Sequence, residues 1–357
     1  MAGLDLGADV VDLAAALCDI PSESGRETAL ADEIERSLRA QPHLTVERDG
    51  DAIVARTNAG RPRRVAIAGH IDTVPIKDNV PSRRAEVDGV DTLVGRGSVD
   101  MKGGVAVQLA LAASLVEPTA DVTWILYDHE EVDAASNGLG RLARQRPELL
   151  AADFAVLCEP TDAVVEGGCN GTLRVRLRYH GVRAHSARPW AGRNAIHAAA
   201  PALAALADWT PEDVEVDGLV YRESLNAVGI AGGVAGNVIP DLAEVTVNYR
   251  FAPSRSGRQA VERVRALFPD AELVVDDLAE GARPGLDAPL AQEFLAAVGA
   301  PARPKHGWTD VARFSALGIP AVNYGPGDPQ RAHTDDEAVA VEQIRACERG
   351  LRAWLTS

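Results

Sequence analysis

Short apolar runs in the first half of the chain end directly on acidic residues and histidines. The run Val65–Ala68 is followed by Gly69-His70-Ile71-Asp72, which places a histidine and an acid two residues apart. Further acids and histidines stand at Asp100, in a loop before a helix of small residues, at Asp128-His129-Glu130-Glu131 and at Glu159. In open α/β sheets the ligand crevice lies beyond the carboxyl ends of the strands. The pattern therefore predicts an α/β sheet whose edge gathers these side chains.

Helical segments separate the apolar runs. Residues 9–40 are expected to form two helices broken at Ile20-Pro21, with Ser24 or a neighbour capping the second helix. Residues 77–97 are polar and turn-rich, and a final helix is expected near Val341–Leu355. Strands that alternate with helices predict a mostly parallel α/β sheet with helices on both faces.

The pattern changes after Gly171. Residues 172–179 alternate between apolar side chains and arginines, which is typical of a half-exposed strand. The elements expected up to residue 284 follow the order βαββαβ of a ferredoxin-like α+β unit. Helical and buried-strand signals then resume. We therefore expect a discontinuous domain of residues 1–171 and 285–357, interrupted by an inserted domain of residues 172–284.

The charge balance excludes several kinds of partner. A formal net charge of −16 argues against nucleic acids and anionic membranes, because both require a basic surface. No apolar stretch reaches the roughly 18 residues of a spanning helix, and no signal peptide is evident. The cysteines are scattered and form no Cys-x-x-Cys pair, so we expect reduced structural thiols in a cytoplasmic protein. They are Cys18, Cys158, Cys169 and Cys347.

The candidate residues favour a catalytic metal centre. Two histidines, His70 and His333, occur with several carboxylates, and this set of nitrogen and oxygen donors suits zinc or a similar ion. Cys158 would point away from Glu159 on an extended strand, so a cysteine-rich structural site is excluded. For any one acid alone, a helix cap or a turn is the simpler interpretation. The segment Asp335–Glu337 is interpreted as partly a solvated helix start, and the role of Glu337 is left open.

Taken together, the motifs resemble the dinuclear zinc aminoacylase and carboxypeptidase metallopeptidase family. The resemblance covers essentially the whole chain, and it implies that the inserted domain is a dimerisation and lid domain. The motifs occur in the family's order. They are Gly69-His70-Ile71-Asp72, Gly95-Arg96-Gly97-Ser98-Val99-Asp100-Met101-Lys102-Gly103-Gly104, Glu130-Glu131, Glu159-Pro160 and His333.

The resemblance implies two Zn²⁺ per subunit, for which Co²⁺ is able to substitute. Asp100 would bridge the two ions, with His70 and Glu159 completing the ligands of one and Glu131 and His333 those of the other.

Further roles are implied for residues that bind no metal. Asp72 would orient His70, and Glu130 would be the general base that activates water and then protonates the leaving amine. His185 of the inserted domain would reach the partner subunit's site in a homodimer and stabilise the oxyanion. His129 is ambiguous, and the structural interpretation is preferred for it.

Within the family, residues 166–172 and 306–314 look most like actinobacterial succinyl-diaminopimelate desuccinylases. This likeness implies hydrolysis of N-succinyl-LL-2,6-diaminopimelate, an anionic substrate of lysine and diaminopimelate biosynthesis. Arg250 matches a family substrate arginine, and Asn237 and Thr309 are weaker candidates. Trp308 stands where many relatives have glycine. The alternatives are an acetylornithine deacetylase, another N-acyl-amino-acid hydrolase or carboxypeptidase of the family, and a non-catalytic member that would lack Glu130.

Overall fold

The computed structural model describes residues 3–357. Met1 and Ala2, which begin the first expected domain, lie outside the described residues. The chain forms two compact units. The first unit holds the residues up to 167 together with 284–303 and 313–357, and the second unit holds 168–283 and 304–312. Residues 304–312 thus cluster with the second unit, whereas the sequence interpretation had placed them in the first.

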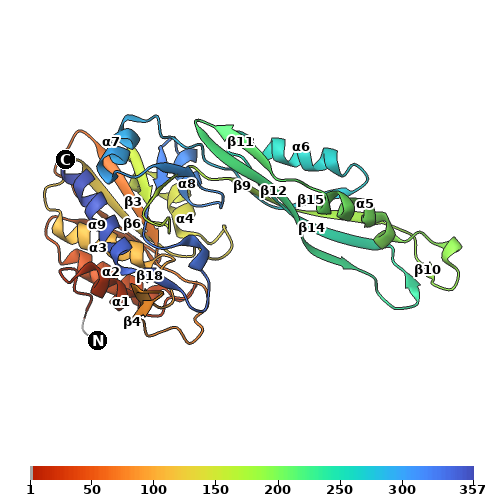
Figure 1. Ribbon diagram of the computed structural model, residues 1–357, viewed down its shortest axis with the longest axis horizontal. Coiled ribbons are helices and arrows are strands. Elements are labelled where there is room, and N and C mark those ends of the chain that lie inside the picture. Colours follow the sequence, from red (N-terminus) through yellow and green to blue (C-terminus); the bar gives the residue numbers. More distant parts are fainter. Residues whose placement is uncertain (1–2) are drawn as a thin grey trace. The chain divides into compact units, whose positions relative to one another are not determined.

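A mixed eight-stranded sheet lies at the centre of the first unit (Figure 1). Its neighbouring strands β6, β3, β7 and β17 run parallel, and β2 and β8 flank them as antiparallel strands. This arrangement confirms the predicted fold class. In sheet order the strands are β1 (Thr45–Asp49), β2 (Ala52–Arg56), β6 (Asp121–Tyr127), β3 (Arg64–His70), β7 (Phe154–Leu157), β17 (Ala321–Asn323), β8 (Val165–Gly167) and β16 (Ala302–Pro304).

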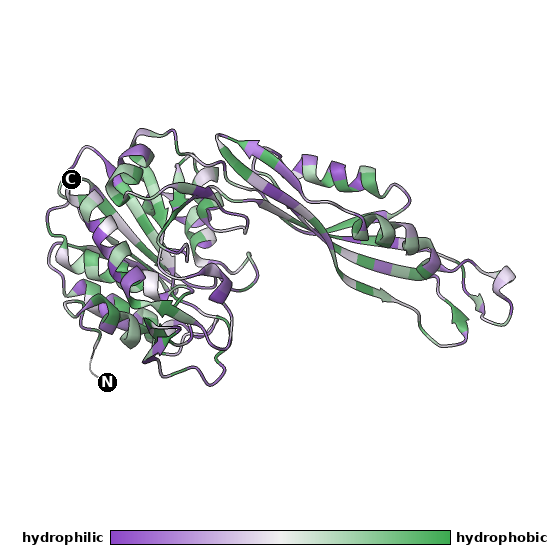
Figure 2. Ribbon diagram, viewed as in Figure 1, coloured by the Kyte–Doolittle hydropathy of each residue, from purple (hydrophilic) through white to green (hydrophobic). Residues whose placement is uncertain are grey.

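Helices cover both faces of this sheet, and the central strands are markedly hydrophobic (Figures 1 and 2). The glycines of α3 allow close packing, since a Cβ at Gly104 would lie 2.3 Å from the carbonyl oxygen of Cys158. The helices are α1 (Val10–Cys18), α2 (Thr28–Arg39), α3 (Lys102–Ser114), α4 (Gly138–Gln145), α7 (Pro289–Val298), α8 (Val311–Ala316) and α9 (Val341–Thr356), with short 3₁₀ turns η1 (Pro147–Leu149) and η3 (Pro329–Arg331).

Two strands of a small three-stranded sheet lie within residues 77–97, which the sequence indicated only as turn-rich. The sheet consists of β4 (Arg83–Val87), β5 (Val90–Val94) and β18 (Ala338–Ala340), in the order β18-β5-β4. Strand β4 is mostly exposed and polar, so it has no apolar alternation from which a strand could be predicted. Through β18, this sheet joins the C-terminal part of the chain to the segment that precedes Asp100.

The second unit is built on a five-stranded antiparallel sheet of order β11-β12-β14-β9-β15. Strands β12, β14, β9 and β15 with the helices α5 and α6 reproduce the predicted ferredoxin-like order, and β11 is an addition. The apolar residues of the alternating strand β9 are buried, as expected. The elements are β9 (Gly171–His180), β10 (Ala184–His185), η2 (Pro189–Ala191), α5 (Ala195–Ala207), β11 (Glu212–Val216), β12 (Leu219–Gly232), β13 (Val238–Ile239), β14 (Leu242–Phe251), α6 (Gly257–Leu267) and β15 (Glu272–Ala279).

All four cysteines are buried and free of disulfides, as the sequence predicted. Among residues 3–357, no helix combines the length and apolar character needed to cross a membrane.

Candidate metal centre

His70 is the last residue of β3 and is only 1% exposed. The neighbouring strands run parallel to β3, so their carboxyl ends lie at the same edge of the sheet. On one side His70 pairs with Tyr127, which immediately precedes the Asp128–Glu131 segment. On the other side Ala68 pairs with Leu157, and continuing this register by two residues brings the buried Glu159 level with His70. The sheet therefore places three of the predicted motifs side by side.

Side chains from four separate segments meet at this edge. The Nε2 atom of His70 lies 3.0 Å from Oδ1 of Asp100, and Nε2 of His333 lies 3.3 Å from Oδ2 of the same carboxylate. His333 also lies 2.9 Å from Oε1 of Glu131. One ligand atom from each of His70, Asp100 and Glu131 falls within a group spanning no more than 4.8 Å. The two oxygens of Asp100 therefore face different histidines, as the predicted bridging ligand requires.

The ring of His70 is held in the orientation that a metal ligand needs. Its Nδ1 atom lies 3.0 Å from the backbone oxygen of Asp72 and 3.4 Å from the carboxylate oxygen Oδ1 of the same residue. A carbonyl oxygen only accepts hydrogen bonds, so Nδ1 carries a proton. Nε2, which faces Asp100, is therefore the nitrogen available to a metal ion.

The carboxylate of Asp72 is a buried hub beside the cluster. It accepts hydrogen bonds from the hydroxyl of Ser24 at 2.7 Å and from the backbone N–H groups of Glu130 at 3.0 Å and Glu131 at 3.1 Å. Burial by itself raises the pKa of Asp72, but the His70 ring and these donors lower it to about 2. The prediction that Ser24 or a neighbour caps α2 was wrong, because that helix has no side-chain cap and Ser24 reaches Asp72 instead.

The cluster is electrostatically suited to cations. Burial lowers the pKa of His70, but hydrogen bonds to Asp100 and Asp72 raise it well above its ordinary value. Hydrogen bonds to Asp100 and Glu131 raise the pKa of His333 to about 10. Burial raises the pKa of Asp100, yet the two histidines together hold it below the ordinary range. The carboxylates thus stabilise positive charge at both histidine positions.

Glu130 and His129 precede the predicted ligand Glu131 but differ in their surroundings. The backbone N–H of Glu130 is fixed on Asp72, which places this partly buried residue next to the cluster. The Nδ1 atom of His129 lies 2.7 Å from Oδ2 of Asp128 and 3.3 Å from Oε1 of Glu27. These contacts with buried acids support the structural interpretation of His129.

Several polar residues have contacts around the site that the sequence did not indicate. Ser24 contacts Asp72 across 48 positions of the chain, and Arg96 binds the buried Glu337 at 2.8 Å. The motif that carries Asp100 includes Arg96, and Glu337 follows His333 by four residues. These positions within or near the motifs were the only sequence signals for Arg96 and Glu337, because local periodicity does not report contacts between distant segments.

The remaining predicted residues belong to the second unit. His185 lies in β10 and pairs with Val238, and the N–H of Ser186 donates to the backbone oxygen of Asn237 at 2.9 Å. Arg250 lies half-buried near the end of β14, and Thr309 is buried beside Cys169. His185 and Asn237 are thus neighbours within the second unit.

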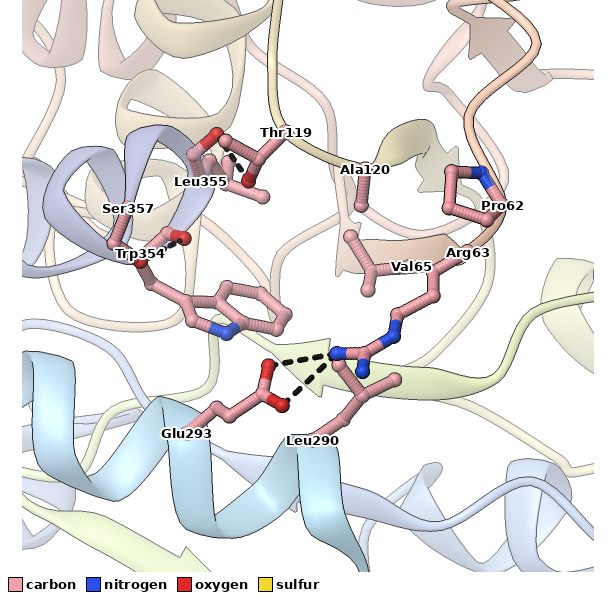
Figure 3. Close-up of a pocket in the computed structure, with 10 residues that line it drawn as sticks. All are labelled: Pro62, Arg63, Val65, Thr119, Ala120, Leu290, Glu293, Trp354, Leu355 and Ser357. Carbon is pink, nitrogen blue, oxygen red and sulfur yellow. Dashed lines mark hydrogen bonds and ion pairs between the residues drawn. The ribbon is translucent and has the colours of Figure 1, made fainter.

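A cavity of about 310 Å³ opens at the opposite end of β3 (Figure 3). Val65, Leu290 and Trp354 contribute to its wall, and Arg63 is paired with Glu293 at 2.9 Å. Its described lining includes no histidine, and the sheet edge that carries His70 lies at the other end of the strand. This cavity is therefore separate from the candidate metal centre.

The parallel strands of the sheet gather two histidines and several carboxylates at their carboxyl edge, a donor set that suits a metal-dependent enzyme. The model of peptidase family M20/M25/M40 matches residues 66–357, and the chain belongs to this family. The family recognised from the sequence motifs is thereby confirmed.

Similar proteins span the whole chain. A Mycobacterium tuberculosis protein with the provisional name succinyl-diaminopimelate desuccinylase DapE is 54% identical over 355 residues, covering 99% of each chain. A Corynebacterium glutamicum succinyl-diaminopimelate desuccinylase is 48% identical over 365 residues, covering 99% of this chain and 98% of the relative. The crystal structure of a Staphylococcus aureus tripeptidase matches with a TM-score of 0.79 at 20% identity, over 97% of this chain and 96% of the other.

Proposed function

We propose that the chain is a two-zinc amide hydrolase that removes succinate from N-succinyl-LL-2,6-diaminopimelate and so yields LL-2,6-diaminopimelate. The observation that carries a two-ion centre is the Asp100 carboxylate, whose oxygens face His70 and His333 at 3.0 and 3.3 Å. The substrate is supported by relatives of that name, which are 54% and 48% identical over nearly the whole chain.

The donor set fits a pair of zinc ions. His70 and Glu159 would hold one ion, Glu131 and His333 the other, and Asp100 would bridge them. Imidazole nitrogens with carboxylate oxygens suit Zn²⁺, and Co²⁺ accepts the same ligands. When bound, such a pair lowers the pKa of a water molecule and polarises the scissile carbonyl group.

Glu130 is the proposed general base. Its backbone is anchored on Asp72, whose carboxylate also accepts the N–H of Glu131 and contacts the ring of His70. One buried carboxylate therefore fixes the base relative to a ligand of each ion. Glu130 would take a proton from the attacking water and deliver it to the amine nitrogen as the amide bond breaks.

His185 is the proposed donor to the oxyanion. Its Nδ1 atom accepts a hydrogen bond from the backbone N–H of Ala187 at 3.0 Å. An accepting Nδ1 places the proton of the neutral ring on Nε2, which leaves an exposed N–H donor. Such a donor is what a developing negative charge on the carbonyl oxygen requires. Asn237, whose backbone is bonded to Ser186, would act beside it.

We further propose a homodimer in which His185 serves the partner subunit's site. Residues 224–232 of β12 pair with β14 on one side, and no described strand pairs with their outer edge. Val228 and Ile230 on this segment are each 60% exposed, and a Cβ at Gly232 would meet Ile196 of α5 at 3.0 Å. An apolar, unpaired edge of this kind is suited to pairing with a second copy of the chain.

Arg250 is the proposed partner of a substrate carboxylate. It is half-buried between Ser224 and Thr172 on the adjacent strands, and among the described residues no carboxylate forms an ion pair with it. Guanidinium binds carboxylate in a bidentate manner, so a half-buried arginine can recognise an anionic acyl chain. Thr309 is a further candidate for substrate contact.

A substrate panel tests the proposed activity. The zinc-loaded protein is incubated with N-succinyl-LL-2,6-diaminopimelate, N-acetylornithine and a dipeptide, and the released acid or amino acid is measured. We expect succinate release at a kcat/KM at least ~100-fold above that for the other two, because the acyl carboxylate needs a charged partner. Preferred cleavage of N-acetylornithine or the dipeptide would assign the chain to another activity of the family.

A further inference from the structure

We propose that Glu337 is a positioning residue that holds the bridging ligand Asp100 in register with His333. Glu337 is 1% exposed and immediately precedes β18, whereas the sequence suggested a partly solvated helix start. Its Oε1 atom accepts the backbone N–H groups of Val99 at 2.9 Å and Asp100 at 3.0 Å. This inference rests on the proposed two-metal function.

The other atoms of Glu337 bind the same loop. Its Oε2 atom accepts a hydrogen bond from Nη1 of the buried Arg96 at 2.8 Å. Its backbone oxygen accepts the N–H of Gly95 at 3.0 Å and the hydroxyl of Ser98 at 3.4 Å. The loop that carries Asp100 is therefore held by hydrogen bonds to a single glutamate, Glu337.

The position of Glu337 in the chain connects two predicted ligands. It follows His333 by four residues, so one short segment carries a ligand and the residue that anchors another. The next residue, Ala338, pairs with Val94 and fixes this segment on β5. The approach of His333 to Oδ2 of Asp100 at 3.3 Å thus depends on the bonds that Glu337 makes.

The carboxylate has to reach all of its donors at once. Charged acceptors form strong hydrogen bonds, and buried donors without an acceptor are costly, so shortening the side chain would displace the loop. Two ligands of one ion, Asp100 and His333, would then be loosened. The ion held by His70 and Glu159 would lose only the placement of Asp100. Binding of the ion held by Glu131 and His333 should therefore weaken more than binding of the other ion.

The experiment compares Glu337→Asp with Glu337→Gln. Aspartate keeps the charge and shortens the reach by about 1.5 Å, the length of one carbon–carbon bond. Glutamine keeps the reach, and its amide oxygen can still accept the N–H groups of Val99 and Asp100, although it loses the charge opposite Arg96. Glu223→Asp is the matched control. The buried carboxylate of Glu223 binds Tyr249, the N–H of Ala252 and Arg255 in the second unit.

The affinities of both Zn²⁺ ions are measured by titration of the metal-free proteins against a chelator, and the Tm of each metal-free protein is recorded. Outer residues that orient metal ligands typically contribute about 10- to 100-fold to metal affinity. We expect Glu337→Asp to lower the affinity for one ion by this amount and the affinity for the other ion by less. Glu337→Gln should stay within about threefold of wild type even where its Tm falls, and its Co²⁺ absorption spectrum should resemble that of the wild type.

The inference is overturned if Glu337→Asp binds both ions as wild type does. It is also overturned if Glu223→Asp lowers the affinities for the ions as much as Glu337→Asp does. The same holds if Glu337→Gln, at an equal loss of Tm, lowers these affinities as much, since lower stability would then be the cause. A wild-type protein that takes up one ion contradicts the two-metal function instead. In that case the affinity of Glu337→Asp for the one ion still decides the role of Glu337.

Discussion

The carboxylate of Asp72 accepts the backbone N–H of Glu130 at 3.0 Å. Through the same carboxylate, Glu130 is linked to the ring of His70, whose Nδ1 lies 3.4 Å from Asp72 Oδ1. The proposed base and the first predicted ligand, which lie 60 positions apart, therefore share one buried anchor. A displacement of this anchor would therefore affect both metal binding and proton transfer.

Replacing Asp72 tests this anchor. In Asp72→Asn the amide nitrogen cannot accept a hydrogen bond, so it loses either the bond from Glu130 or the bonds that Ser24 and Glu131 donate to the other oxygen. We expect both zinc affinity and kcat to fall by about 10- to 100-fold. Asp121→Asn is the control, since the buried Asp121 accepts the N–H groups of Ala59 and Arg61 at the opposite end of the sheet. The anchor role of Asp72 is contradicted if Asp121→Asn lowers zinc affinity and kcat as much as Asp72→Asn does.

Removing the carboxylate of Glu130 separates proton transfer from metal binding. Glu130→Gln keeps the size of the side chain and the backbone bond to Asp72, so both ions should remain bound. We expect kcat to fall by ~10²- to 10⁴-fold, the usual contribution of a general base. The measurements are zinc content and the rate of succinate release. Unchanged turnover in a fully loaded variant would contradict the assignment of the base.

The sheet edge could be predicted because a buried strand is a strong local signal. The apolar run that ends at His70 and the run before Asp128 both indicate strands, and parallel packing brings their ends together. Asp100 and His333 lie in loops, and His333 has the positive φ of 66° that is unusual outside glycine. No periodicity predicts that these two side chains meet, and only the resemblance of the motifs indicated it.

The contacts that hold the loops could not be predicted for a related reason. Glu337 binds Val99 across 238 positions of the chain, and such a pairing leaves no trace in local composition. The hairpin of β4 and β5 was not predicted, because its exposed polar residues have the composition of a loop. Likewise, Ser24 stands just before a helix, as a capping residue would, although its hydroxyl is bonded to Asp72.

Mixing two inactive variants tests whether His185 acts across the dimer. His185→Ala keeps its own Glu130, and Glu130→Ala keeps its own His185. If each His185 serves the partner's site, every mixed dimer contains one complete site. After subunit exchange, roughly a quarter of wild-type activity should return, because half of the dimers are mixed and each has one working site. Activity that stays at the level of the separate variants would place His185 in its own subunit's site.

The buried cysteines should be unreactive in the folded protein. Burial raises the pKa of Cys18 to about 12 and that of Cys169 to about 11, from an ordinary value of 9.0. It likewise raises the pKa of Cys158 and Cys347. A thiol-specific disulfide reagent at about pH 8 should therefore label none of them without denaturant and all four in urea, since the thiolate is the reactive form.

The same shifts give the sign of a stability change with pH. Above the ordinary pKa an unfolded thiol releases its proton, whereas the folded thiol retains it up to its raised pKa. The unfolded state then binds fewer protons, so the free energy of unfolding should fall as the pH rises from about 9 toward 11. Rapid labelling of a cysteine in the native protein near pH 8 would contradict the described burial.

Zinc titration of the metal-free protein with N-succinyl-LL-2,6-diaminopimelate as substrate tests the central claim most directly. Succinate release is measured against the number of zinc ions bound per chain. The described geometry predicts that activity becomes maximal only when two ions are bound, because Asp100 presents one oxygen toward His70 and the other toward His333. Full activity with a single ion, or no succinate release with two ions bound, would contradict the proposed two-zinc desuccinylase.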